Sequence, residues 1–470
     1  MCSDTEACTC HPMSYEIRST VYSKVRHKMS GYDEDESRMA LRLYHAVEEN
    51  NLKTLRLLLV KGANIHYKYF DDKSLLHICC EKDRLECAKL LMEFGAIVQA
   101  QDEWNMTPLM YCMVRHFCDI ANELLARDPQ SVHSQDKFGK SVIHCATEFG
   151  SVELLKLVLS HGADVDQTDW YGITPLMTLC AGTGIRHSKE LCRVLLDAGA
   201  NIELKDIRSR RTALQFAAVQ KNADLVQLLV GAGADPNTTD NACLSPLTSV
   251  IFQFYRLKNA SCDLNDDLMT IVIILTQAGA NLNLNTRESS NPLYMAVNFK
   301  VEPLLRFFLD HGADPNVKFP MGGTPLLTAV KKKDAACVRA LLNWSARSNI
   351  RGRVFRTAHV HDQYWVDAME LAMDQGCWDI VLLLYSAGYN ISRLHYLRED
   401  VIDCEVPESL SRDKEMLTYL QYLARNPRTL FHLTTICIWK SIQSNIQENI
   451  KQLPLPTRIK QLTSPEFVLE

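Results

Sequence analysis

The chain has 470 residues, and its 51 lysines and arginines against 56 aspartates and glutamates give a formal net charge of −5. Hydrophobic residues make up 47% and charged residues 23%, values typical of globular proteins, so the composition excludes a chain that is disordered throughout. Nucleic acids and anionic membranes are usually bound through a basic excess, and the net charge therefore argues against both as partners.

Residues 1–36 are predicted to form an N-terminal tail. The first thirty residues contain no apolar stretch of the kind that a secretory signal requires, and no apolar run approaches the roughly 18 residues that cross a bilayer. Cys2, Cys8, Cys10 and His11 lack the paired C-x2-C spacing of ordinary zinc modules, so we expect no metal site in this tail.

The number and positions of the cysteines indicate the cellular compartment in which the protein resides. There are 17 of them, an odd number, and several stand at apolar positions such as Cys79, Cys112 and Cys145. Buried free thiols are typical of a reducing environment. We therefore expect a soluble, non-secreted protein of the cytoplasm, with the nucleus as the alternative.

From about residue 37 the sequence repeats with a base period of 33 residues, the distance from Gly62 to Gly95. In phase with the glycines, Ser, Thr or Asn precedes a short apolar run, as in Thr107-Pro108-Leu109. The side-chain oxygen of such a residue caps a helix, and Pro is tolerated at the first helical position. The glycine after the next apolar run is a typical left-handed cap. The pattern predicts about ten units of turn, helix and helix. The Gly-Ala-polar mark occurs at Gly62, Gly162, Gly199, Gly233, Gly279 and Gly312.

This period and the T-P-L signature resemble those of ankyrin repeats from residue 37 to residue 393. The resemblance implies an all-α solenoid of helix-turn-helix units. The fifth, seventh and tenth units are longer than the repeat, around residues 182–188, 254–267 and 351–365. Insertions in a solenoid fall in loops, because stacked helices admit no extra length without losing their contacts.

His77 and His144 invite a catalytic or metal-binding interpretation. Both stand at a predicted helix start, where an imidazole can bridge neighbouring turns, so we interpret both as structural. The GKS at residues 139–141 lacks the first glycine of a phosphate-binding loop, and no H-E-x-x-H, G-x-S-x-G or G-x-G-x-x-G occurs. We predict no catalytic residue, no cofactor and no metal. An enzyme that uses a reactive cysteine and a histidine stays an alternative, because the two need not be close in sequence.

The turns between units carry aromatic and basic residues, and ankyrin arrays bind partners through such turn tips. Trp, Tyr and Arg side chains most often dominate the binding energy of protein interfaces. The alternative is that adjacent tips stack their aromatic side chains on each other and hide them. The predicted binding surface for a protein substrate comprises Trp104, Phe138, Trp170, Tyr171, Arg208, Arg210 and Arg211.

After residue 393 the period stops. Residues 394–424 are predicted to be a connecting helical segment, and residues 425–465 combine apolar residues at helical spacing with a Leu-Pro-Leu-Pro stretch. The latter segment resembles a SOCS box, so the chain is similar to members of the ankyrin repeat and SOCS box family. The resemblance implies that elongin C contacts Thr429, Leu430, Leu433, Thr434 and Ile438, and that a cullin contacts Leu453, Pro454, Leu455, Pro456 and Arg458.

The family resemblance implies a non-catalytic adapter for an unknown protein substrate. Its partners would be elongin C, elongin B and a cullin, expected to be the fifth, with its RING protein. Thr434 stands where the family usually has Cys, and burying its hydroxyl costs about 1–3 kcal/mol unless it is hydrogen-bonded. The alternative is an ankyrin-repeat scaffold without ligase recruitment, whose C-terminal segment merely caps the solenoid.

Overall fold

The computed structural model describes residues 34–258, 266–284, 291–319, 323–355, 363–391, 394, 397 and 406–425. The chain divides into two compact units, Met1–Arg208 and Ser209–Glu470, and each is described by itself. Both are built from short helices, as the repeat pattern predicts. Within the described ranges, none of the helices has the length and apolarity needed to span a membrane.

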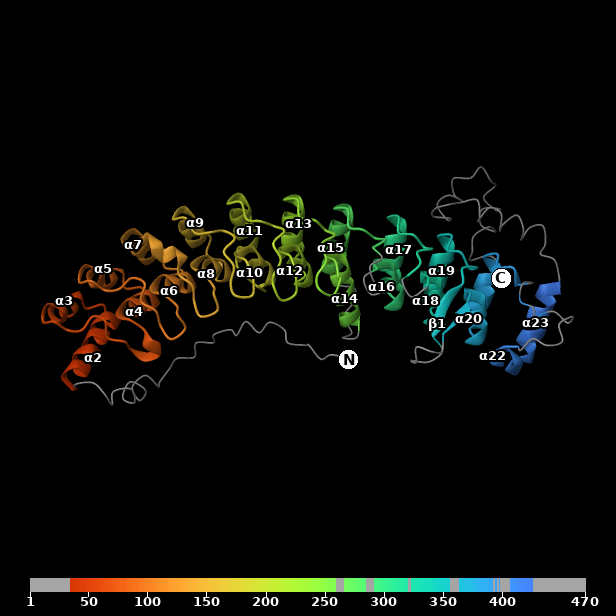
Figure 1. The fold of residues 1–470 in the computed structure, drawn as a ribbon, viewed down its shortest axis with the longest axis horizontal. Coiled ribbons are helices and arrows are strands. Elements are labelled where there is room, and N and C mark those ends of the chain that lie inside the picture. Colours follow the sequence, from red (N-terminus) through yellow and green to blue (C-terminus); the bar gives the residue numbers. More distant parts are fainter. Residues whose placement is uncertain are drawn as a thin grey trace. The chain divides into compact units, whose positions relative to one another are not determined.

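The first unit contains helix pairs that stack side by side. Figure 1 shows the first helix of each pair in one layer and the second helix in another. Two short 3-10 helices, η1 (Phe70–Asp72) and η2 (Pro129–His133), lie between pairs. The pairs are α2 (Glu34–Glu48) with α3 (Leu52–Val60), α4 (Leu75–Lys82) with α5 (Leu85–Glu93), α6 (Pro108–Arg115) with α7 (Cys118–Arg127), α8 (Val142–Glu148) with α9 (Val152–Ser160), and α10 (Pro175–Ala181) with α11 (Ser188–Asp197).

The second unit repeats this two-layer arrangement and ends in two further helices (Figure 1). Its pairs are α12 (Ala213–Val219) with α13 (Ala223–Gly231), α14 (Pro246–Lys258) with α15 (Asp266–Gln277), α16 (Pro292–Asn298) with α17 (Glu302–Asp310), α18 (Pro325–Lys331) with α19 (Ala335–Asn343), and α20 (Ala368–Asp374) with α21 (Trp378–Ser386). The last helices are α22 (Glu408–Arg412) and α23 (Lys414–Arg425).

The helix starts follow from the sequence marks. The Thr174 hydroxyl accepts a hydrogen bond from the Met177 N–H at 3.2 Å, and Thr324 caps α18 in the same way. Proline occupies the first helical turn of α10, α16 and α18. Gly162 follows α9 with φ 82°, the left-handed conformation that the cap requires. Between these ends, apolar residues such as Leu154 are fully buried and form the core between neighbouring pairs.

Both histidines connect one repeat to the next. The Nδ1 atom of His77 accepts from the Ser74 N–H at 3.0 Å, and its Nε2 donates to the Met106 carbonyl at 2.9 Å. His144 makes the corresponding pair of hydrogen bonds. In the second unit, Gln215 takes the same place, and its amide oxygen accepts while its amide nitrogen donates. The structural interpretation of the two histidines is therefore confirmed.

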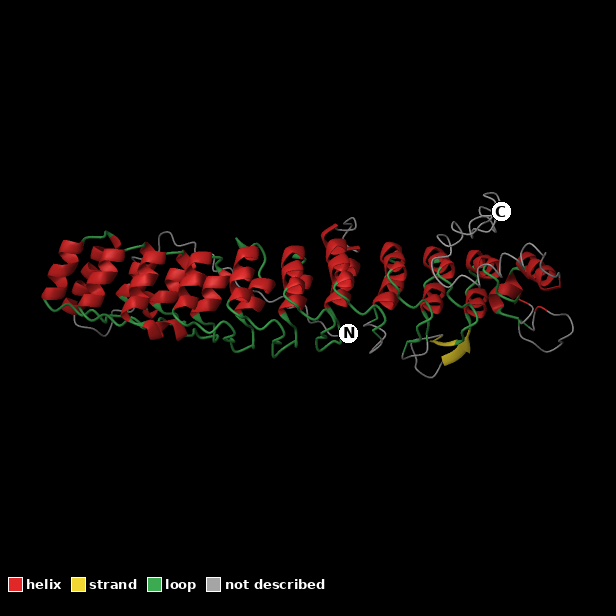
Figure 2. Cartoon of the chain, turned by 90° about the horizontal axis from the view of Figure 1, so that it is seen from above, coloured by secondary structure: helices red, strands yellow, loops and turns green. Residues whose placement is uncertain are grey.

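Two of the three insertions have a described structure. Residues 182–187 form a loop that packs closely against the preceding pair. If Gly150 carried a Cβ atom, this atom would lie 3.1 Å from the carbonyl oxygen of Arg186 in the loop. The third insertion contains strands β1 (Gly352–Phe355) and β2 (Gln363–Val366), which pair antiparallel with Gly352 opposite Val366. This two-stranded sheet (yellow in Figure 2) is an addition to the predicted all-α fold. Of the second insertion, residues 259–265 lie outside the described residues.

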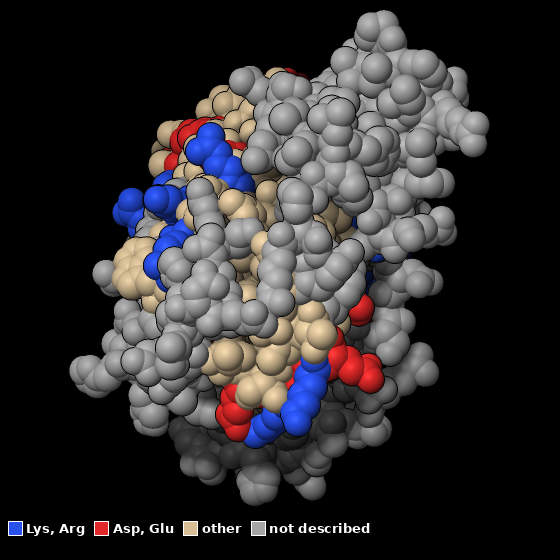
Figure 3. Space-filling view, turned by 90° about the vertical axis from the view of Figure 1, so that its right-hand side faces the viewer, with Lys and Arg blue, Asp and Glu red and all other residues tan. Residues whose placement is uncertain are grey.

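The end of the last repeat is covered by the chain itself. Helix α22 packs on α20, and the Ser409 hydroxyl donates to the Met373 carbonyl. Leu410 of α22 and Leu420 of α23 are fully buried. Figure 3 faces this end and shows both signs of charge around uncharged side chains in the part that is coloured.

Burial gives these histidine bridges a pH dependence. Desolvation lowers the pKa of His77 from 6.5 to about 4 and also lowers the pKa of His144. Between pH 4 and pH 6.5, His77 binds a proton in the unfolded chain but not in the folded chain. The free energy of unfolding is therefore expected to fall as the pH decreases from 6.5 toward 4, by about 1.4 kcal/mol per pH unit for His77.

The substitutions His77→Gln and His144→Gln test this expectation, because Gln215 shows that glutamine can make both bonds. Urea denaturation at several pH values should give a flatter pH dependence for the double variant than for the unaltered protein. Identical pH dependences would contradict the assignment of the two imidazoles as neutral bridges.

Candidate functional site

The turn tips of the first unit are held by aspartate side chains, of which Asp102 and Asp169 are buried. One carboxylate oxygen of Asp102 accepts from the N–H groups of Trp104 and Met106, both at 2.8 Å. Asp136 and Asp169 hold the next two tips in the same way. Each tip thus has a fixed shape that presents the residue two positions after the aspartate.

A residue with positive φ closes each tip. The φ angles are 58° at Asn105, 78° at Gly139 and 74° at Gly172. Gly139 meets a second constraint, because a Cβ atom there would lie 2.9 Å from the Trp170 nitrogen and 2.4 Å from its Cδ1 atom. The third tip therefore lies directly against the second.

A ladder of backbone hydrogen bonds joins the tips in a row, along one side of the helices (loops green in Figure 2). In each step, an N–H of one tip donates to a carbonyl of the preceding tip. The steps are Lys137 to Trp104 at 2.8 Å, Trp170 to Phe138 at 3.2 Å and Ile207 to Tyr171 at 2.9 Å.

The aromatic side chains on this row are exposed. Trp104 and Phe138 stack with their ring centroids 6.4 Å apart, yet they remain 43% and 45% exposed. Trp170 and Tyr171 are 67% and 53% exposed. The Lys137 ammonium lies 5.2 Å from the centre of the Trp104 ring, a cation–π contact. Stacking between tips thus occurs without hiding the rings, and their role in binding stays a prediction.

The three arginines differ from one another. Arg208 is exposed in the first unit, whereas Arg210 and Arg211 belong to the second unit. The Arg211 guanidinium donates to a carboxylate oxygen of Asp240 at 3.3 Å, and the other oxygen of Asp240 holds its own tip. Arg211 therefore has a structural role, while Arg208 and Arg210 present exposed side chains.

Two exposed residues of the row were missed by the sequence analysis. Ile207 is 70% exposed. It directly follows Asp206, as Trp170 directly follows Asp169, so its equivalent position in the repeat could have indicated that it lies on a tip. Phe70, in η1, is 51% exposed, and the carbonyl of Asp71 accepts from the next tip at 2.8 Å. We call the exposed tip residues Phe70, Trp104, Phe138, Trp170, Tyr171 and Ile207 the tip row.

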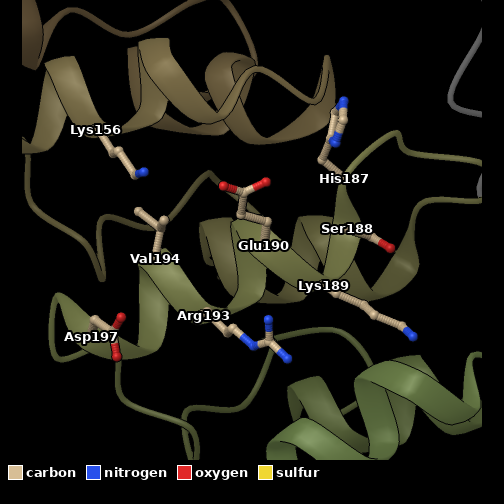
Figure 4. Close-up of a pocket in the computed structure, with 8 residues that line it drawn as sticks. All are labelled: Lys156, His187, Ser188, Lys189, Glu190, Arg193, Val194 and Asp197. Carbon is tan, nitrogen blue, oxygen red and sulfur yellow. The ribbon is translucent and has the colours of Figure 1, made fainter.

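An open depression of about 680 Å³ lies between α9 and α11. Figure 4 shows Lys156 reaching from α9 toward α11, and Lys189, Glu190 and Arg193 projecting from α11 in different directions. Cations and carboxylates are mixed there, and Lys189, Glu190 and Arg193 are exposed. The arrangement does not converge on a ligand of one charge, and we assign it no function.

Several buried cysteines lack the properties of an activated nucleophile. Burial raises the pKa of Cys145 and of Cys192 to about 12, and it raises that of Cys79 as well. An activated thiol instead needs a lowered pKa and solvent access. Among the described residues, no group of three or more His, Cys, Asp or Glu side chains is placed to hold a metal ion. Cys2, Cys8, Cys10 and His11 lie outside that part of the chain.

The predicted ligase-binding residues also lie outside the described residues, which end at Arg425. This applies to Thr429, Leu430, Leu433, Thr434 and Ile438, and to Leu453, Pro454, Leu455, Pro456 and Arg458.

Two family models together match most of the chain. The model described as ankyrin repeats (3 copies) matches residues 43–136, 117–206, 143–240 and 257–352, which together exceed half of the sequence. The model described as SOCS box matches residues 426–461.

Individual relatives agree with these matches. The chain is 29% identical to ankyrin repeat and SOCS box protein 16 of Mus musculus over 206 residues, 43% of this chain and 45% of that protein. The Homo sapiens protein of the same name is 29% identical over 196 residues, 41% and 43% of the two chains. The chain thus spans less than half the length of these two relatives. Putative ankyrin repeat protein YahD of Escherichia coli (strain K12) is 31% identical over 202 residues, 42% of this chain and 89% of that protein.

A solved structure is also similar. The human ASB11 ankyrin repeat domain matches with a TM-score of 0.41 and 23% identity, covering 49% of this chain and 96% of that one.

The helix pairs and hydrogen-bonded tips define a protein of the ankyrin-repeat class. With the SOCS box match that follows the repeats, the chain belongs to the ankyrin repeat and SOCS box family.

The close approach of neighbouring tips predicts that alanine substitutions at two glycines with similar backbone conformations will cost different amounts of folding free energy. Gly139 and Gly162 have φ values of 78° and 82°, but a Cβ atom at Gly162 would meet nothing within 4 Å. Gly162→Ala is expected to cost about 1 kcal/mol, the cost of placing alanine in a left-handed conformation. Gly139→Ala should cost more, because Trp170 must also move. Equal losses in urea denaturation would contradict the close approach of the two tips.

Proposed function

We propose that this protein is the non-catalytic substrate-recognition subunit of a ubiquitin ligase built on elongin B, elongin C, a cullin and a RING protein. The repeats bind a protein target, and the segment from residue 425 to residue 465 recruits the ligase. The observation that carries the proposal is the SOCS box match at residues 426–461, which follows a repeat array with an exposed tip row. We take the cullin to be the fifth.

Recruitment uses the binding of a helix in a groove. A few apolar anchors, led by Leu430, enter pockets on elongin C, and the Leu-Pro-Leu-Pro stretch at residues 453–456 contacts the cullin. Thr434 is close to cysteine in size, and its hydroxyl can donate to the Leu430 carbonyl if the segment is helical. Such a bond removes most of the cost of burying the hydroxyl.

The covered end of the second unit supports ligase recruitment over the scaffold alternative. In that alternative, the segment after residue 425 serves only to cap the repeats. Leu394, Leu397, Leu410 and Leu420 are already buried at the end of the array, and α22 packs on α20. This cover, supplied by residues before 426, supports a role for the SOCS box segment in binding another protein.

The tip row supports the binding of a protein target. Its residues share the composition of interface centres, and Lys137 and Arg208 place positive charge beside them. A target segment with apolar anchors and carboxylates fits this surface. We also propose a reducing compartment, the cytoplasm or the nucleus, because the described cysteines are free and most are buried.

The recruitment proposal predicts opposite outcomes for two substitutions. Leu430→Asp should abolish co-purification of elongin C, because a carboxylate cannot enter an apolar pocket without a large desolvation cost. Leu430→Met, which keeps the position apolar, should retain elongin C, and Thr434→Cys should retain or strengthen it. A pull-down that Leu430→Asp leaves unchanged would refute the assignment of the elongin-binding helix.

Removal of residues 426–470 separates the proposal from the scaffold alternative. The truncated protein should lose elongin C but unfold at nearly the same urea concentration, because α22 remains packed on α20 and α23 on α22. Its repeat-bound targets, identified by proximity labelling, should be retained. A marked loss of stability would instead show that the removed segment caps the repeats.

A further inference from the structure

The first and the last helix pairs differ in how the described chain covers them. In the second unit, α22 packs on α20 of the last pair. In the first unit, α4 packs on α2 and α5 on α3, and no described helix lies on the other side of this first pair (Figure 1). Among the described residues, the outer face of α2 and α3 is therefore open.

The period of the repeat identifies the side chains on this outer face. Leu57 of α3 and Leu90 of α5 are equivalent positions, but Leu90, in a helix that packs on α3, is 6% exposed, whereas Leu57 is 55% exposed. Ile78 of α4 is 3% exposed, whereas the side chain of its equivalent, His45 of α2, is 35% exposed. The outer face thus corresponds to the surface through which α4 and α5 contact the pair before them.

Apolar side chains remain exposed on this face. Val60 of α3 is 70% exposed, and it lies on the same side of its helix as Leu57, because three residues separate the two. Leu41 of α2 is 36% exposed, and it lies on the same side of α2 as His45, four residues further on. Three apolar side chains from two helices are therefore accessible on the outer face.

Basic side chains lie beside these apolar ones. Arg38 and Arg42 are four residues apart on α2, and Arg42 stands three residues before His45, so all three share one side of the helix. In α3, Lys53 precedes Leu57 by four residues and lies on the same side of that helix. Arg38, Arg42 and Lys53 are exposed, and none of them has an ion-pair partner among the described residues.

The described acidic side chains of α2 do not neutralise these cations. Asp35 stands three residues before Arg38, but these two described residues form no ion pair. Glu36 instead accepts a side-chain hydrogen bond at 2.8 Å, and Glu48 lies 3.7 Å from the imidazole of His45. The middle of α2 therefore presents positive charge.

The need to cap the array explains only part of this composition. A terminal repeat requires a polar outer surface, which accounts for Arg42 at the position equivalent to the buried Leu75. It does not account for Leu57 and Val60, which expose more than half of their surface at positions where a polar side chain would serve.

We propose that the outer face of the first pair binds an acidic amphipathic helix of another protein. Apolar side chains of that helix pack on the exposed leucines and valine, and its carboxylates lie near the cations. A helix fits this place because the equivalent surface of α4 and α5 contacts the helices α2 and α3. The proposal concerns a different surface from the tip row, and it holds whether or not the protein recruits a ligase. We call Arg38, Leu41, Arg42, Lys53, Leu57 and Val60 the end face.

Charge complementarity selects another protein over the chain's own N-terminal segment. In that segment, Ile17, Val21 and Val25 have helical spacing, but residues 15–29 around them contain four lysines and arginines against one glutamate. They would bring positive charge to a basic surface. A second copy of the end face would bring its own arginines and is disfavoured for the same reason.

The test uses the full chain and a fluorescent synthetic helix with leucines along one side and glutamates on either side of them. We expect anisotropy titrations to give a Kd of about 10–100 µM that weakens as salt is added. The double variant Arg38→Glu and Arg42→Glu should weaken binding at least about tenfold. The matched variant Lys156→Glu and Arg193→Glu changes the net charge equally at two exposed positions of the first unit and should leave binding unchanged.

Leu57→Gln tests the apolar contact, because glutamine keeps the helix propensity and removes the apolar surface. It should weaken binding about tenfold, whereas Ile273→Gln, at an exposed apolar position of α15, should leave binding unchanged. Circular dichroism checks that each variant remains folded.

Three outcomes would overturn the proposal. The first is no binding by the full chain at up to about 1 mM peptide, the result expected if residues 1–33 of the chain occupy the end face. The second is an equal loss of affinity in the two charge-reversal variants. The third is equally tight binding of a control helix with lysines in place of the glutamates.

Discussion

The structure depends on a polar bridge between successive repeats, made by the third residue of the first helix in a pair. In a solenoid, each repeat contacts only its neighbours, so every such bridge positions the next turn relative to the helices before it. His77 and His144 make this bridge in the first unit and Gln215 makes it in the second. Their acceptors are the carbonyls of Met106, Ile173 and Leu244, each at the base of a turn tip. The presentation of the tip row therefore rests on buried side chains that never meet a partner.

Much of the fold could be predicted because its determinants lie within one repeat. A threonine that caps its own helix, a proline in the first turn and a glycine with positive φ act over a few residues, so their spacing is readable in the sequence. The role of His77 was also predictable, since its two partners stand at fixed distances along the repeat. The conformation of residues 351–365 was not, because an insertion breaks the period on which such arguments depend.

The candidate site was predictable only in part. Sequence position indicates that Trp104 and Phe138 lie on neighbouring tips, but their exposure depends on how two large rings share the available space. Arginine is common in binding interfaces, which is why Arg211 was selected from the sequence. Its side chain instead forms an ion pair with Asp240 of the following repeat and has a structural role. Ile207 shows the opposite case, since selecting residues by chemical type passes over an isoleucine whose position alone exposes it.

Helices α22 and α23 have a consequence for how such proteins diversify. Among the described residues, α22 packs on α20 and α23 on α22, and Leu420 is fully buried in this cover of the last repeat. The junction near Arg425 thus lies between a repeat array with its own end cover and the segment that matches the SOCS box model. A join at this point allows either part to be exchanged while the helices of the other are kept.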